Sequence, residues 1–121
     1  MPSSTAQPRY VTAYWKARVT RANGKHYWAH TRTICTTDIN FEISEYLKEK
    51  EVLRVQVYAF HKGARRLLAL KGHVSYSVLL SSGTSFGVDM VYDHIESQSL
   101  NFIKEYMQDR QKSQRGGWSL V

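Results

Sequence analysis

The chain has 121 residues, 42% of them hydrophobic, and its 17 Lys and Arg against 10 Asp and Glu give a formal charge of +7. One domain fits this length, and the apolar fraction is too high for a disordered chain. No stretch approaches the ~20 apolar residues of a membrane-spanning helix, the first residues lack a signal-peptide core, and the lone Cys35 excludes an internal disulfide. These features exclude a membrane protein, a disulfide scaffold and a two-domain enzyme, and they predict a cytoplasmic protein.

The N-terminal third predicts a β-hairpin. Residues 1–9 are rich in Ser, Thr, Pro and Gln and are expected to form a flexible arm. From Tyr10 to Thr20, apolar and polar residues alternate, which is typical of a half-buried strand. Asn23-Gly24 then favours a two-residue type I′ turn, followed by a second strand from Lys25 to Thr36.

A two-residue loop at Asn23-Gly24 fixes the register of this hairpin and therefore its two faces. It places Val19 opposite Trp28, so that Trp15 and Trp28 share one apolar face, which is the expected core. The opposite face, expected to be open, carries Tyr, Lys, Arg and Thr side chains. The two faces exchange roles if the helices cover the other side of the sheet.

A first helix is predicted from Ile39 to about Lys50. Thr36, Thr37 and Asp38 are good helix-capping types, and apolar residues recur after them with helical spacing. The stretch from Ile39 to Ile43 also alternates, so an extended start is the alternative.

The remaining chain predicts further strands and a second helix. Strands are expected at 52–60, 65–70, 73–80 and 86–92, with a turn at residues 61–63, and Gly72 predicts a bulge or a bend within one long strand. A helix is expected at about 97–112 and a flexible tail at 113–121. The fold class predicted is α+β, with one domain over 10–112. It has two layers, a mainly antiparallel sheet of about five strands and two helices on one face, in the order β-β-α-β-β-β-α.

Charge follows the predicted elements. Residues 1–36 and 52–88 contain no acid and carry +6 and +5, whereas 37–51 and 89–121 carry −3 and −1. Strand-rich segments therefore hold +11 and helix-rich segments −4, which predicts a positive sheet side.

Aromatic rings beside cations on an open sheet face suit single-stranded nucleic acid, because bases stack on the rings while cations meet phosphates. This is the leading functional hypothesis, against the simpler reading of an ordinary solvated face. The residues assigned to nucleic-acid binding are Tyr14, Lys16, Arg18, Tyr27, Arg65 and Arg66.

Two alternatives remain open. The first is a protein-interaction or self-associating module that uses Trp118 and Leu120, which have no evident core partner. The second is a small-molecule pocket lined by Trp15, Trp28 and Tyr46.

No constellation of residues argues for an enzyme, a cofactor or a metal. The histidines lack metal-ligand spacing, Cys35 has no activating motif, and the loop at residues 81–85 has no Walker pattern. The expectation is a non-enzymatic binding domain without a cofactor, a metal or a membrane partner.

Overall fold

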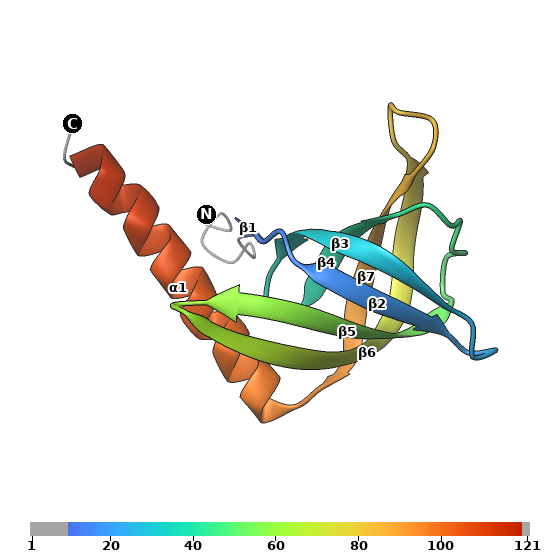
Figure 1. Cartoon of the computed structure of the whole chain (residues 1–121), viewed down its shortest axis with the longest axis horizontal. Helices are drawn as coiled ribbons and strands as arrows, with labels where there is room; N and C mark the ends of the chain where they lie inside the picture. Colours follow the sequence, from blue (N-terminus) through green and yellow to red (C-terminus); the bar gives the residue numbers. More distant parts are fainter. Residues whose placement is uncertain (1–9, 120–121) are drawn as a thin grey trace, which may run out of the picture.

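The computed structural model describes the backbone of residues 10–119 and the side chains of residues 10–112 (Figure 1). Its elements are β1 (Val11–Thr12), β2 (Lys16–Arg21), β3 (His26–Ile34), β4 (Asp38–Ile43), β5 (Val52–His61), β6 (Ala64–Leu79), β7 (Phe86–Ile95) and α1 (Ser97–Ser119). The strands form one antiparallel sheet in the order β1-β3-β2-β5-β6-β7-β4, and β3 also pairs with β4. That last pairing closes six strands into a barrel, with β1 attached outside it.

The predicted two-layer α+β class is therefore wrong. The principal error is the helix predicted over 39–50, because residues 38–43 form β4 between β3 and β7. Ile39, Phe41 and Ile43 all point into the barrel and are fully or almost fully buried. The apolar residues of this segment fit both a helix and a strand. Pairing with a strand on each side of β4 favours the strand, in which every second residue is buried.

The hairpin between β2 and β3 has the predicted position and a different register. The Arg21 amide donates to the Lys25 carbonyl, so the loop contains three residues, and only Gly24 has a positive φ, of 91°. The Asn23 side chain accepts a hydrogen bond from the Lys25 amide at 2.9 Å, as in an Asx turn. Val19 consequently pairs with Tyr27, and Trp28 moves to the outer side of the barrel.

The hairpin between β5 and β6 turns where predicted. Lys62 and Gly63 both have positive φ, 54° and 75°, which is the requirement of a type I′ turn. The segments predicted at 65–70 and 73–80 are one bent strand, β6, and its register against β7 shifts at Gly72. A β-carbon at Gly72 would lie 2.0 Å from the Val91 carbonyl oxygen, so only glycine fits this close approach.

The barrel interior is filled by aliphatic side chains that alternate along every long strand. Each buried Val, Leu or Ile contributes about 1.5–3 kcal/mol relative to exposure. The largest fully buried side chains include Ile34, Ile39, Phe41, Leu53, Val55, Val57, Leu68 and Met90.

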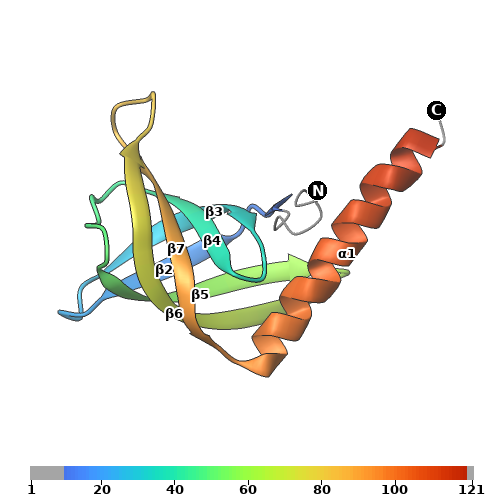
Figure 2. The same cartoon turned by 180° about the vertical axis from the view of Figure 1, so that it is seen from behind.

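Helix α1 lies across one end of the barrel, and its C-terminal turns project beyond it (Figures 1 and 2). Tyr106 anchors it, with its ring 4.7 Å from the Trp15 ring and its hydroxyl donating to the Thr12 carbonyl at 2.8 Å. Asp109 accepts from His61 at 2.8 Å and pairs with Lys62 at 3.0 Å, both at the tip of the β5–β6 hairpin. The helix continues past the predicted end at Lys112, so the predicted tail begins as helix. Within the described residues, no helix combines the length and apolar character needed to cross a membrane.

Candidate functional site

The outward side chains of β2, β3, β5 and β6 form one continuous surface, which we call the outer face. The pairing places them in rows across the barrel: Lys16 lies beside His30 and Tyr58, and Arg18 lies beside Trp28 and Gln56. The next strand, β6, extends these rows, because it pairs with the full length of β5.

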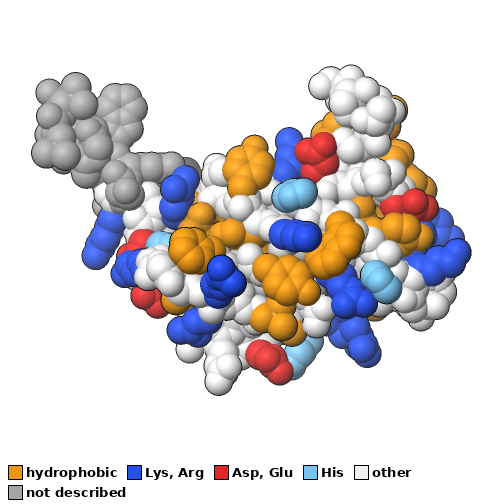
Figure 3. All heavy atoms as spheres, viewed as in Figure 1, with side chains coloured by type: hydrophobic (Ala, Val, Ile, Leu, Met, Phe, Trp, Pro, Cys, Tyr) orange, Lys and Arg blue, Asp and Glu red, His pale blue; other side chains and the backbone are white. Residues whose placement is uncertain are grey.

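Four of the exposed large apolar side chains lie near one another on the outer face, and we call them the aromatic cluster: Trp28, Tyr58, Phe60 and Leu67. They are 53%, 42%, 55% and 55% exposed. The rings of Trp28 and Tyr58 are 6.1 Å apart, and Leu67 is the register partner of Tyr58. The Lys16 ammonium lies 4.3 Å from the centre of the Trp28 ring, in a cation–π contact. Figure 3 shows apolar side chains separated by cations and histidines on this side of the molecule.

The four strands that carry the outer face contain no Asp or Glu. Their cations are Lys16, Arg18, Arg21, Arg32, Arg54, Arg65, Arg66 and Lys71. The acids of the sheet lie instead on β4 and β7. The positive charge predicted for strand-rich segments thus belongs to one group of neighbouring strands.

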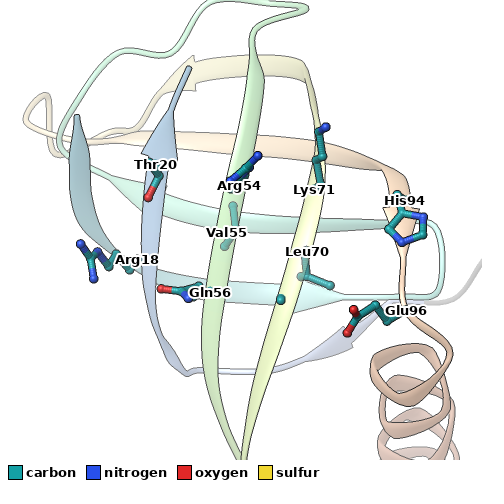
Figure 4. A pocket seen from close by; sticks show the side chains of 10 residues that line it. Arg18, Thr20, Arg54, Val55, Gln56, Leu70, Lys71, His94 and Glu96 are labelled. Atoms are coloured by element: carbon teal, nitrogen blue, oxygen red, sulfur yellow. The ribbon is translucent and has the colours of Figure 1, made fainter. Parts of the chain in front are cut away.

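A groove of about 520 Å³ crosses the outer face next to the aromatic cluster (Figure 4). Its polar lining comes from β2, β5, β6 and β7 and from the residue that follows β7: Arg18, Thr20, Arg54, Gln56, Lys71, His94 and Glu96. Ala69 supplies the apolar part of the lining, and Val55 and Leu70, whose side chains are buried in the core, border the groove. We call this hollow the cationic groove.

A second hollow, at the seam between β4 and β7, is acidic. It contains Asp38 and Asp89, both only 6% exposed, with Tyr10 at its rim. Burial is the main cause, and the neighbouring Asp38 the second, that raises the pKa of Asp89 to about 7. For Asp38, burial favours the neutral form, but hydrogen bonds from Asp89 and Thr37 outweigh it and lower the pKa. Anionic ligands are disfavoured here, because the pair already holds one buried negative charge.

The structure divides the six residues assigned to nucleic-acid binding. Lys16, Arg18 and Arg65 lie on the outer face. Tyr27 faces inward and packs against the core, and Arg66 points to the opposite side of its strand from Arg65, with its guanidinium 6.0 Å from the Phe102 ring of α1. Tyr14 is 76% exposed in the irregular segment between β1 and β2.

The three rings of the alternative pocket do not lie together. Trp15 is buried against α1, Trp28 lies on the outer face, and Tyr46 is half exposed beside Phe86. The other alternative rests on Leu120 and the side chain of Trp118, which lie outside the described part of the chain.

The aromatic cluster is what the sequence reasoning missed. The assumed two-residue loop assigned Trp28 to the core, and Tyr58, Phe60 and Leu67 were not selected. A usable signal exists in β5, where small aliphatic residues alternate with larger or polar ones, and Tyr58 and Phe60 fall on the polar side.

No protein-family model matches the chain, and no curated protein is significantly similar to it in sequence. Solved structures do match. The inhibitor of motility MotI/DgrA from Bacillus subtilis has a TM-score of 0.80 at 14% identity, over 90% of this chain and 52% of that one. The PilZ domain of YcgR from Escherichia coli, solved with c-di-GMP, has a TM-score of 0.66 at 7% identity, over 95% of this chain and 98% of that domain. The MrkH–c-di-GMP complex of K. pneumonia has a TM-score of 0.68 at 10% identity, over 85% of this chain and 50% of that one.

These matches show that the chain has the fold of the PilZ domain, and that it spans about half the length of MotI and MrkH. They also correct the nucleic-acid hypothesis and the α+β class. The ligand held by YcgR and MrkH is c-di-GMP, not a nucleic-acid strand, and the residues assigned to strand binding do not form one surface. The protein-interaction alternative is better supported than the nucleic-acid hypothesis.

Proposed function

We propose that the chain is a non-enzymatic binding module that docks a protein partner on its outer face. The observation that carries this proposal is the aromatic cluster, four large apolar side chains left exposed on neighbouring strands. Contiguous exposed apolar groups on an otherwise polar surface are typical of interaction sites.

The chemistry of the cluster fits a docking anchor. Trp and Tyr are the residue types that most often dominate binding energy at interfaces, because they bury a large area at a small cost in side-chain freedom. Trp28 is further held in place by Lys16 on its face and Tyr58 at its side. The surrounding cations, without an acid on the same four strands, favour a partner with an acidic rim.

The test is affinity capture with the full chain and two variants. In the first, Trp28→Ala and Tyr58→Ala are combined. The second, Tyr46→Ala, is a matched control, because Tyr46 is 52% exposed and Trp28 53%, but it lies beside Phe86 instead of on the outer face. Proteins captured by the wild-type chain are identified by mass spectrometry, purified and titrated.

A specific partner is expected to bind the wild-type chain and the Tyr46→Ala variant alike. The double variant should lose at least about tenfold in affinity, since truncation of a central aromatic anchor costs on the order of 2 kcal/mol. Equal affinity of all three proteins for the purified partner would refute docking on the outer face.

We also propose c-di-GMP as a small ligand of the chain, because structures of the same fold, from YcgR and MrkH, hold it. Calorimetric titration with c-di-GMP, with GMP as the control, tests this ligand. Saturable binding of c-di-GMP that GMP does not reproduce is expected. Absence of heat at several hundred micromolar c-di-GMP, or equal binding of GMP, would remove this ligand without touching the proposal of partner docking.

A further inference from the structure

The cationic groove has a shape suited to a small molecule. In the pairing, Ala69 is flanked by Gln56 on β5, and its short side chain leaves a depression between the longer side chains around it. The volume of about 520 Å³ lies within the usual range of ligand sites, roughly 300–1,000 Å³, and exceeds that of an isolated inorganic ion.

The charge of the groove is positive and largely uncompensated. Arg54 and Lys71 are register partners, so their charges lie side by side, and Arg18 borders the same hollow from β2. Ion pairs among the described residues involve none of these three cations. Among the described residues, Glu96 is the only acid that lines the hollow.

Arg18 carries a separate indication of a missing partner. Its Nε atom is shielded from solvent and has no hydrogen-bond partner among the described residues. A shielded guanidinium nitrogen without an acceptor is costly, because it has lost water and gained nothing in exchange. An anionic oxygen in the groove would supply that acceptor if the guanidinium turned its Nε atom toward the hollow.

We propose that the cationic groove binds a small phosphate-bearing molecule. Arg18, Arg54 and Lys71 would meet the phosphate oxygens, since charge-assisted hydrogen bonds from guanidinium and ammonium groups are the strongest contacts available to such a ligand. The apolar lining at Ala69 accommodates the organic part of the molecule. This site is separate from the aromatic cluster, so it does not depend on the proposed partner, and it is tested without c-di-GMP, so its failure is distinguishable from failure of the proposed c-di-GMP binding.

The test is a titration of the isotopically labelled chain with AMP, adenosine and pyrophosphate, followed by amide chemical shifts. AMP and adenosine differ only in the phosphate. The groove variant combines Arg54→Gln and Lys71→Gln. The control combines Lys104→Gln and Lys112→Gln, two exposed cations on α1 that do not line the groove, so the change in net charge is identical.

Saturable shifts centred on β5 and β6 are expected with AMP and pyrophosphate but not with adenosine. The groove variant should bind at least tenfold more weakly and the control within about twofold of wild type. Equal weakening of both variants, equal binding of adenosine, or shifts centred elsewhere would overturn the proposal.

If the groove variant does not fold, the single variant Arg18→Gln provides a second test, which is its affinity for AMP. It removes the guanidinium with the unpartnered Nε atom and leaves the other two cations in place. At least a threefold loss of AMP affinity is expected, and an unchanged affinity would count against the site.

Discussion

At the scale of single residues, the most unusual feature is the pair of buried carboxyl groups, Asp38 and Asp89. Asp38 accepts hydrogen bonds from the Thr37 hydroxyl at 2.7 Å and the Tyr10 hydroxyl at 3.2 Å, and its burial leaves room for one charge only. The pair holds a single proton, carried by Asp89, whose pKa burial and Asp38 raise to about 7.

This arrangement predicts a loss of stability with rising pH. In the unfolded chain Asp89 ionises near pH 4, and in the folded chain near pH 7, so the folded state holds the extra proton between these values. The free energy of unfolding therefore falls as pH rises from about 4 to 7. Asp89→Asn keeps a donor toward Asp38 at every pH, so the variant should be more stable than wild type at pH 8, by roughly 1–2 kcal/mol.

Urea denaturation at pH 5 and pH 8 measures this effect. The difference between the variant and wild type should be small at pH 5 and favour the variant at pH 8. Glu49→Gln, which removes an exposed acid from a turn, is the control and should leave the pH dependence unchanged. A wild-type chain that is equally stable at both values would show that the pair does not share a proton.

At the scale of elements, the strands and turns from Val52 onward were predictable because their alternation and their turn residues agree. The β5–β6 loop falls where predicted, and the final helix begins where predicted but continues beyond its predicted end. The strand from Asp38 to Ile43 was not predictable, because the spacing of its few apolar residues fits a helix and a strand equally. Only pairing with β3 and β7, contacts distant in sequence, decides between them.

The candidate surface depended on a smaller difference, one residue in a loop. With two loop residues Trp28 lies in the core, and with three it lies outside beside Lys16. Asn-Gly is compatible with both loops, so the local sequence did not determine which face Trp28 occupies. Lys16, Arg18 and Arg65 reached the outer face as expected, since their own strands have simple alternation.

Helix α1 is attached to the barrel through few side chains, and Tyr106 is central among them. Tyr106→Ala removes the packing on Trp15 and the hydrogen bond to the Thr12 carbonyl, at a cost of about 3–4 kcal/mol. Because the barrel strands pair with one another without α1, the variant should release the helix while the barrel stays folded. Hydrogen exchange should then show lost protection in α1 and retained protection in β5 and β6.

Two further variants serve as controls for this prediction. Tyr106→Phe keeps the ring and loses only the hydrogen bond, so a smaller effect of about 1 kcal/mol is expected. Gln108→Ala alters an exposed position on the same helix and should change nothing. Loss of protection throughout the barrel in Tyr106→Ala would show that the helix and barrel unfold as one unit.

At the scale of the whole molecule, charge divides the barrel into two sides of different chemistry. Four neighbouring strands carry cations and no acids, and the two remaining barrel strands carry the acids of the sheet. Both the aromatic cluster and the cationic groove lie on the cationic side. A partner and a small anion would therefore approach the same half of the molecule, and each would alter the field that the other meets.

Closure of the barrel also determines how a partner can be held. Each of the six barrel strands has a neighbouring strand on both sides, but β6 pairs with β5 only over residues 64–73 and with β7 only over residues 70–79. On β6, the unpaired backbone amides and carbonyls that let many β-domains recruit a peptide as an additional strand are therefore confined to one flank of residues 64–69 and the other flank of residues 74–79. Where strands are paired on both flanks, recognition depends on side chains, so binding specificity there can change through surface substitutions that leave the backbone framework intact.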